Sequence, residues 1–142
     1  MTRPDLDTTM LDIAWVLARR ATCSKLAVGC VLTDARNRIV GSGYNGVPHG
    51  RPHCTDTPCE GAGTPSGSNS CIAVHAEMNA LLVCKDVQEI QTCYTTHAPC
   101  LQCTKTLLNT SCQRIVYRAD QYEPAAQNLW IAAGRRWEQM YK

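Results

Sequence analysis

Short β-rich runs alternate with helical segments through the second half of the chain, and this alternation limits the possible folds more than any other feature of the sequence. A strand, a helix and a second strand in succession form parallel strands with helices packed on the sheet. The predicted segments are a helix over 75–84, a strand over 92–96, a helix over 100–109, a strand over 114–118, a helix over 124–133 and a last strand over 136–141. We therefore expect an α/β fold.

The first half of the chain adds one helix and a hairpin. Apolar residues recur at helical spacing over 5–20, behind two N-terminal carboxylates, and predict a helix there. Two β-rich runs over 27–33 and 38–44 are separated by Asp34-Ala35-Arg36-Asn37 and predict a hairpin. The complete prediction is a three-layer α-β-α sandwich around a mixed, mainly parallel five-stranded sheet.

The composition fits one domain over residues 1–142. The chain is 44% hydrophobic and 18% charged, which suits an ordinary core and excludes a disordered chain. A formal net charge of +2 gives no basic surface for tight binding to a long nucleic acid, although a few cations could hold a small anion. The segment from 45 to about 70 is dense in Gly, Pro, Ser, Thr and Cys, and a loop of that length needs a function or an internal staple.

Ten cysteines bear on the compartment. The N-terminus lacks the pattern of a secretory signal and no apolar run could span a bilayer, so we expect a cytoplasmic protein without a membrane partner. A reducing cytosol favours thiols and thiolate–metal bonds over disulfides. We expect Cys30, Cys84, Cys93 and Cys112 to be small buried hydrophobes, because their neighbours are apolar. The alternative, a disulfide-linked protein, predicts few free thiols after unfolding.

Two cysteines stand at the start of a predicted helix, directly after a predicted strand. Pro99-Cys100-Leu101-Gln102-Cys103 places two thiolates on the first turn, where both can reach one metal ion and the helix dipole favours their charge. A single C-x-x-C pair also fits a redox pair, half of a zinc knuckle or an accident. The pair indicates a metal site only when a further ligand accompanies it.

His75 and Glu77 begin another predicted helix. With the two cysteines they complete the pattern H-x-E…P-C-x-x-C, which is typical of zinc nucleobase deaminases. Three ligands, His75, Cys100 and Cys103, leave tetrahedral zinc one position for water, as in catalytic sites. Zinc lowers the pKa of its water to about 7. The resulting hydroxide would attack carbon 4 of a cytosine, while Glu77 carries protons to ring nitrogen 3 and to the departing amino group.

Nearly the whole chain resembles the deoxycytidylate (dCMP) deaminases. The zinc segments appear as Val74-His75-Ala76-Glu77-Met78-Asn79-Ala80-Leu81 and Tyr94-Thr95-Thr96-His97-Ala98-Pro99-Cys100-Leu101-Gln102-Cys103. Further likeness lies in Val28-Gly29, Gly43-Tyr44-Asn45-Gly46 and Asp120-Gln121-Tyr122. Related tRNA adenosine, riboflavin-pathway and free-cytosine deaminases share the zinc ligands but do not usually combine them with these segments. The resemblance implies a cytidine deaminase-like fold and hydrolysis of dCMP to dUMP and ammonia.

The resemblance also implies substrate contacts. Asn45 would bond the deoxyribose 3′-hydroxyl, Lys25 would lie near the 5′-phosphate and Tyr122 beside the nucleotide. Ala76 and Thr96 would contact the base through backbone groups. For Lys25 and Tyr122, a solvated lysine and a half-buried tyrosine are equally good interpretations. Further phosphate candidates are Arg19, Arg20 and Arg51.

A subset of the family carries a second, structural zinc, and this chain has cysteines for a closed Cys₄ site. The candidate ligands are Cys23, Cys54, Cys59 and Cys71, with His53 as a substitute. Such a site would staple the loop insertion around 45–73. Cys71 lies only four residues before His75, so its side chain would face elsewhere if it joined the same helix.

Members of the family are often hexamers that dCTP activates and dTTP inhibits, so the resemblance implies a homo-oligomer with these effectors. Some members accept dCTP or 5-substituted cytosine nucleotides, which are the alternative substrates. An enzyme for another base or for RNA is a further alternative, which the modest charge disfavours. A zinc-binding module without catalysis is the last alternative, but it gives no role to a carboxylate such as that of Glu77 beside an open metal position.

Overall fold

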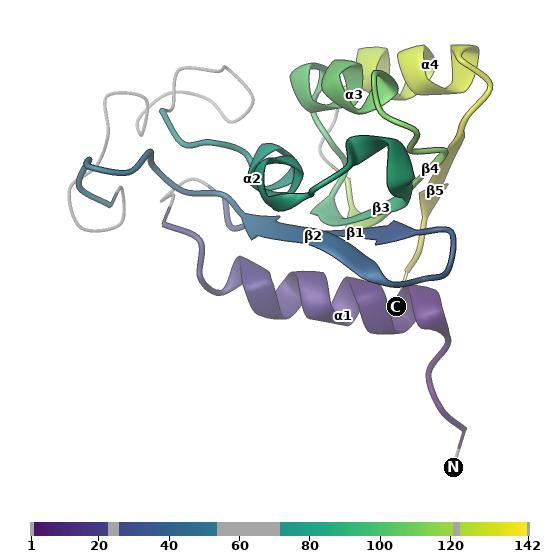
Figure 1. Ribbon diagram of the computed structural model, residues 1–142, viewed down its shortest axis with the longest axis horizontal. Helices are drawn as coiled ribbons and strands as arrows, with labels where there is room; N and C mark the ends of the chain where they lie inside the picture. The colour runs from purple at the N-terminus through teal and green to yellow at the C-terminus, as the bar shows by residue number, and fades with distance from the viewer. Residues whose placement is uncertain (1, 23–25, 54–71, 121–122, 142) are drawn as a thin grey trace.

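The computed structural model describes residues 2–22, 26–53, 72–120 and 123–141, which form the layers drawn in Figure 1. In chain order, the elements are α1 Leu6–Ala18, β1 Gly29–Asp34, β2 Ile39–Tyr44, α2 Ala76–Val83, the 3-10 helix η1 Val87–Glu89, β3 Ile90–His97, α3 Leu101–Leu108, β4 Arg114–Ala119, α4 Pro124–Ala132 and β5 Arg136–Gln139. Every predicted helix and strand is present, and its ends differ from the prediction by at most two residues. Within the described residues, η1 is the only element that was not predicted.

The five strands form one sheet in the order β2-β1-β3-β4-β5. β1 runs antiparallel to β2 and to β3, whereas β3, β4 and β5 run parallel to one another. Four strands therefore point the same way and only β1 opposes them, which confirms the mixed, mainly parallel sheet. The predicted hairpin joins β1 to β2, and Asp34 Oδ1 accepts the N–H groups of Arg36 and Arg38 there, each at 2.9 Å.

Helices cover both faces of the sheet, as the alternation predicts. α1 lies on one face, and α2, α3 and α4 lie on the other (Figure 1). Leu11 and Ala14 of α1 are fully buried in an apolar cluster with side chains of β1, β3 and β4. A second cluster joins Ala80 of α2, Leu107 of α3 and Trp130 of α4 to the opposite face of the sheet. Two apolar cores thus hold the three layers together.

The sheet and α1 approach each other most closely at Gly29. A Cβ atom at this position would lie 1.8 Å from the carbonyl oxygen of Ala14, in the backbone of α1. Any side chain would therefore force the helix away from the sheet. The close approach gives a physical reason for glycine in the Val28-Gly29 segment.

Three of the four cysteines expected in apolar surroundings are buried, free thiols, namely Cys30, Cys93 and Cys112. Cys84 is only partly buried, because it follows the exposed last turn of α2.

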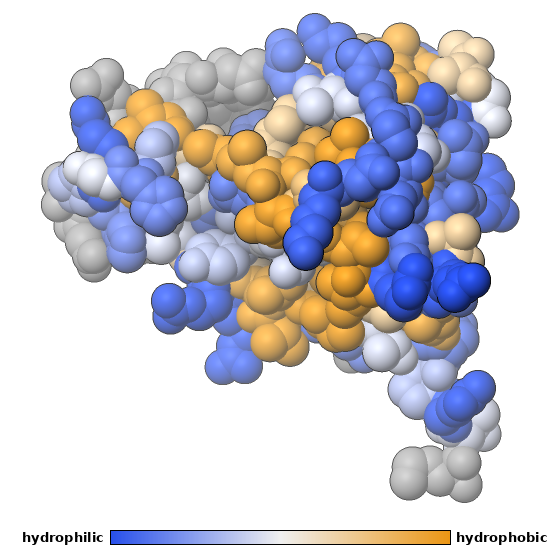
Figure 2. All heavy atoms as spheres, in the orientation of Figure 1, coloured by the Kyte–Doolittle hydropathy of each residue, from blue (hydrophilic) through white to orange (hydrophobic). Residues whose placement is uncertain are grey.

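Figure 2 shows apolar side chains gathered on the face where α2 and β2 lie. Within the described residues, no helix reaches the length and hydropathy that a membrane span requires.

A network of ion pairs ties the start of α1 to β4 and β5. Arg114 of β4 donates to the two carboxylate oxygens of Asp7 at 2.8 and 2.5 Å, and its Nε donates to Glu138 of β5 at 2.8 Å. The hydroxyl of Tyr94 donates to Asp7 Oδ1 at 2.6 Å. The bonds from Arg114, and then the bond from Tyr94, hold the pKa of Asp7 below its usual value. Asp7 therefore stabilises the fold in its charged form.

Asp7→Asn should destabilise the protein at neutral pH. Because folding lowers the pKa of Asp7, the contribution of its carboxylate is fully present above about pH 4 and is lost as the pH falls through the lower, folded-state pKa. We expect a cost of about 1–3 kcal/mol at pH 7 that shrinks below pH 4, measured by urea denaturation. Asp12→Asn is the control: it removes a more exposed pair with Arg118 and should cost less than about 1 kcal/mol. A cost of Asp7→Asn that is the same at both pH values would contradict this account.

Candidate active site

The helices α2 and α3 begin beside each other, at the end of the sheet where β3 finishes. Cys100 is the N-cap of α3, and its Sγ accepts the N–H of Cys103 at 3.5 Å. His75 is the N-cap of α2 and has the same extended backbone conformation. The first N–H groups of a helix have no carbonyl partner within it, and the helix dipole is positive there. Both helix starts therefore favour negative charge at one place.

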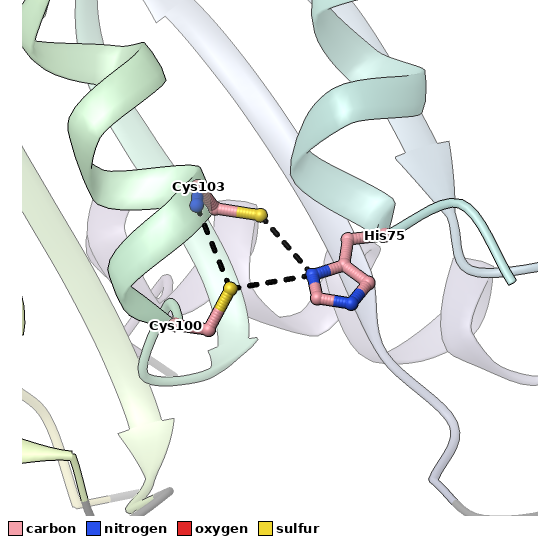
Figure 3. Close-up of side chains that lie close together, drawn as sticks. All are labelled: His75, Cys100 and Cys103. Carbon is pink, nitrogen blue, oxygen red and sulfur yellow. Dashed lines mark hydrogen bonds between the residues drawn. The ribbon is translucent and has the colours of Figure 1, made fainter. Parts of the chain in front are cut away.

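The three predicted metal ligands meet between these two helix starts (Figure 3). His75 Nδ1 lies 3.4 Å from the sulfur of Cys100 and 3.3 Å from the sulfur of Cys103, and all three ligand atoms lie within 4.8 Å of one another. Donors bound to one tetrahedral zinc lie roughly 3.5–3.8 Å apart. The spacing thus suits a single ion, and no other such group occurs within the part of the chain that the structure describes.

The two thiols cannot both carry a charge without a cation. The bond with Cys103, and then the bond with His75, lowers the pKa of Cys100 to about 4. The pKa of Cys103 is raised, first by its bond with Cys100 and then by burial. A divalent cation would let both sulfur atoms ionise, since a coordinating thiol loses its proton. Two thiolates and an imidazole form a donor set that zinc prefers, so the residues fit Zn²⁺.

Glu77 stands in the first turn of α2 and is only 4% exposed. Burial raises the pKa of its carboxyl to about 7; Cys100 adds to the rise, and His75 opposes it. Glu77 lies outside the group of three ligand candidates. A carboxyl with this pKa can accept and release a proton near neutral pH, which suits a general acid and base.

Asn45 is buried and holds the chain segment that leads into β1. Its Oδ1 accepts the N–H of Val28 at 2.8 Å, and its Nδ2 donates to the carbonyl of Leu26 at 2.6 Å. The sequence did not reveal this structural role. An amide has a second lone pair and a second N–H, so the side chain keeps the capacity to bond a ligand.

Ala76 and Thr96, which we expect to meet the base through their backbones, are both fully buried. Thr96 Oγ1 accepts the N–H of Gly29 at 3.2 Å and lies 2.8 Å from Nδ1 of His97. The ring of His97 in turn lies 5.6 Å from the ring of Trp15 on α1. These contacts fix Thr96 at the end of β3, and its contact with a base stays a prediction.

Several predicted site residues fall outside the described part of the chain. They are Cys23, Lys25, Cys54, Cys59, Cys71 and Tyr122. The described candidates Arg19, Arg20, Arg51 and His53 are exposed. The expected roles of all these residues stay predictions.

Two contacts near the site fix α2 against β2. Asn79 Nδ2 donates to the carbonyl of Tyr44 at 2.8 Å. A Cβ atom at Gly43 would lie 2.7 Å from the backbone nitrogen of Ala80 and 2.8 Å from the carbonyl oxygen of Ala76. Glycine at 43 and asparagine at 79 therefore let α2 lie close to the sheet, and α2 carries the predicted proton carrier.

Sequence reasoning did not find Glu123. Its Oε2 accepts the N–H of Leu101, in the first turn of α3, at 3.0 Å. The available signal was a carboxylate directly before Pro124, a pattern typical of a helix start. That signal does not reveal a bond to a different helix.

Comparison with known proteins agrees with this geometry. The family model for the cytidine and deoxycytidylate deaminase zinc-binding region matches residues 4–119. The chain belongs to this deaminase family.

Relatives of this deaminase differ in how much of their own length they share with it. The deoxycytidylate deaminase of Mycobacterium phage D29 is 39% identical over 125 residues, which cover 82% of this chain and 97% of the phage protein. The ComE operon protein 2 of Bacillus subtilis is 36% identical over 132 residues, which cover 88% of this chain and 66% of that protein. The deoxycytidylate deaminase of Schizosaccharomyces pombe is 33% identical over 139 residues, which cover 93% of this chain and 43% of the yeast protein.

A solved structure shares the fold of this deaminase. The dCMP deaminase of the cyanophage S-TIM5, solved in complex with dCMP and dUMP, superposes with a TM-score of 0.80 at 21% identity. The match covers 99% of this chain and 100% of the cyanophage chain. The likeness confirms the cytidine deaminase-like α/β sandwich.

Gly43→Ala should damage the site of the deaminase through α2. The added methyl meets the backbone of α2, which must move away from β2 and take the start of the helix with it. We expect the zinc content after dialysis against a weak chelator to fall at least about tenfold, in line with the loss of a supporting contact. Gly134→Ala is the control, because a methyl there meets nothing within 4 Å but sits at a φ of 81°; it should cost about 1–2 kcal/mol and leave the zinc content unchanged. Equal zinc contents in the two variants would contradict the prediction.

Proposed function

We propose that this deaminase catalyses the hydrolytic deamination of dCMP to dUMP, with release of ammonia. The observation that carries the proposal is the meeting of His75, Cys100 and Cys103 next to the buried carboxyl of Glu77. The name of the phage relative, and the two nucleotides bound in the cyanophage structure, support a deoxycytidylate substrate.

In this proposal, His75 Nδ1 and the sulfur atoms of Cys100 and Cys103 hold the zinc ion. Zinc bound there supplies a Lewis acid that lowers the pKa of a water molecule to about 7. The two helix starts stabilise the negative charge of the thiolates. Three protein ligands leave room for water, which supports a catalytic site over a closed structural one.

Glu77 acts as the proton carrier. It accepts a proton from the attacking water and delivers it to ring nitrogen 3 of the cytosine, while the water oxygen forms a bond with carbon 4. It then carries the second proton of that water to the amino group, the bond between carbon 4 and nitrogen breaks, and ammonia leaves. The buried position of Glu77 and its pKa of about 7 support transfer in both directions.

The remaining roles concern the nucleotide. The unused lone pair and N–H of Asn45 support a bond to the deoxyribose 3′-hydroxyl. Ala76 and Thr96 contact the base through their backbones. Lys25 at the 5′-phosphate and Tyr122 beside the nucleotide rest on the family resemblance.

Ammonia release from the zinc-loaded protein tests the proposed reaction. The substrates are dCMP, CMP, dCTP, 5-methyl-dCMP, deoxycytidine and cytosine, each with and without dCTP and dTTP as effectors. We expect turnover confined to the deoxycytidylates. Turnover of cytosine but not of dCMP would contradict the proposal. If a folded protein with zinc bound released no ammonia from any of these substrates, the result would indicate a zinc module without catalysis.

Glu77→Gln separates catalysis from metal binding. The amide keeps the size of the side chain but cannot carry a proton, so dCMP turnover should fall by about 10²–10⁴-fold or more. Zinc content and thermal stability should stay close to those of the unaltered protein, because Glu77 is not a ligand. Glu89→Gln, on the exposed η1, is the matched control and should keep full activity. A Glu77→Gln protein that stays active would remove the proton carrier from the mechanism.

We also propose that residues 1–142 form a single domain. In this domain, four cysteines hold a second, structural zinc ion, with His53 as a substitute ligand. The proposed ligands are Cys23, Cys54, Cys59 and Cys71. The loop insertion around 45–73 supports this site, because it is rich in Gly and Pro and needs a staple. Metal analysis should give about two zinc ions per chain and about one after Cys54→Ser, with a lower melting temperature. About one ion in the unaltered protein would contradict the second site.

A cytoplasmic homo-oligomer, hexameric as is frequent in the family, with dCTP and dTTP as effectors, completes the proposal. The exposed apolar side chains of Ile39 on β2 and of Leu82 and Val83 on α2 support a contact between subunits. The ten cysteines support a reducing compartment.

A further inference from the structure

Glu123 connects the start of α4 to the start of α3. It directly precedes Pro124, the first residue of α4. Its Oε2 accepts the N–H of Leu101, the first residue of α3, at 3.0 Å. One carboxylate thus joins the starts of α4 and α3, and the start of α3 carries Cys100 and Cys103.

A second hydrogen bond joins the same two chain segments on the other side of Cys100. The N–H of Ala98 donates to the carbonyl of Ala119, at the end of β4, at 2.9 Å. Pro99 has no N–H to offer. The backbone around Cys100 is therefore held at Ala98 on one side and at Leu101 on the other.

The first turn of α3 depends on these bonds because its N–H groups have no carbonyl partner within the helix. The sulfur of Cys100 accepts the N–H of Cys103, at 3.5 Å. Glu123 accepts the N–H of Leu101, where the helix dipole also favours a carboxylate. Without Glu123, the half-buried N–H of Leu101 loses this acceptor, and the first turn of α3 loses one of the bonds that hold it in place.

We propose that Glu123 is a positioning residue of the metal centre. It holds the first turn of α3 through Leu101, so that the sulfur of Cys100 stays in register with Nδ1 of His75, 3.4 Å away. The inference rests on the proposed zinc site and assigns to Glu123 no contact with zinc or substrate.

The affinity for metal tests this role directly. Competition with a chromogenic chelator gives the zinc affinity, and the thiolate-to-metal absorption of the Co²⁺-loaded protein reports the sulfur ligands. Glu123→Ala should weaken zinc binding by about 10–100-fold and reduce that absorption, as expected for the loss of a group that orients a ligand. Glu123→Gln should stay within about threefold of the unaltered protein, because its amide oxygen can accept the same N–H.

Asp5→Ala is the matched control. Asp5 caps α1 on the other face of the sheet, where its carboxylate accepts the N–H of Thr8 at 2.7 Å. Its loss should lower the melting temperature by a few degrees, on the order of the effect of a lost helix cap, and leave the zinc affinity unchanged. This control separates a weaker fold from a displaced ligand.

Three results would overturn the inference. They are an unchanged affinity and Co²⁺ spectrum in Glu123→Ala, an equal loss in Glu123→Gln and Glu123→Ala, or a loss of the same size in Asp5→Ala. The readout is independent of dCMP: a protein that binds zinc as described but turns over no nucleotide contradicts the proposed function and leaves the role of Glu123 standing. An unaltered protein that binds no zinc contradicts both.

Discussion

Two helix starts that point at one small volume would repel each other if nothing negative lay between them. The dipoles of α2 and α3 are both positive there, and several N–H groups lack partners within their helices. The sulfur of Cys100 supplies a compensating charge, a bound cation would let Cys103 ionise as well, and His75 Nδ1 lies 3.3–3.4 Å from both sulfur atoms. The sheet positions the two helix starts beside each other, because β3 leads directly into α3 and α2 packs closely on β2 at Gly43.

The same arrangement explains why one carboxyl near the metal site remains a non-ligand. Glu77 follows His75 by two residues, so the turn of the helix directs the two side chains differently. Its carboxyl is almost completely buried, and this burial raises its pKa to about 7. An exposed glutamate would be ionised at pH 7 and a poor proton donor.

The ligand candidates His75 and Cys100, which lie 25 positions apart, were predicted from the described H-x-E…P-C-x-x-C pattern. The helices and strands were predicted from local features, because they depend on residues close together in the sequence. Helical periodicity, turn residues and the C-x-x-C spacing are signals of that kind. The missed contacts join residues that are far apart along the chain. Glu123 reaches Leu101 across 22 positions and Asn45 reaches Val28 across 17. Only the packed layers bring such groups together, so no pattern in one segment could reveal them.

The bond between Asp7 and Arg114 spans 107 positions and sets a condition on synthesis. At about 5–20 residues per second, a ribosome needs roughly 5–20 s to make Arg114 after Asp7. Until that interval ends β4 is missing, and for most of it β3 is missing too, so Leu11 and Ala14 have no complete surface to cover them. The nascent chain of this protein therefore exposes the apolar side chains of the α1 segment until their partners on the sheet are made.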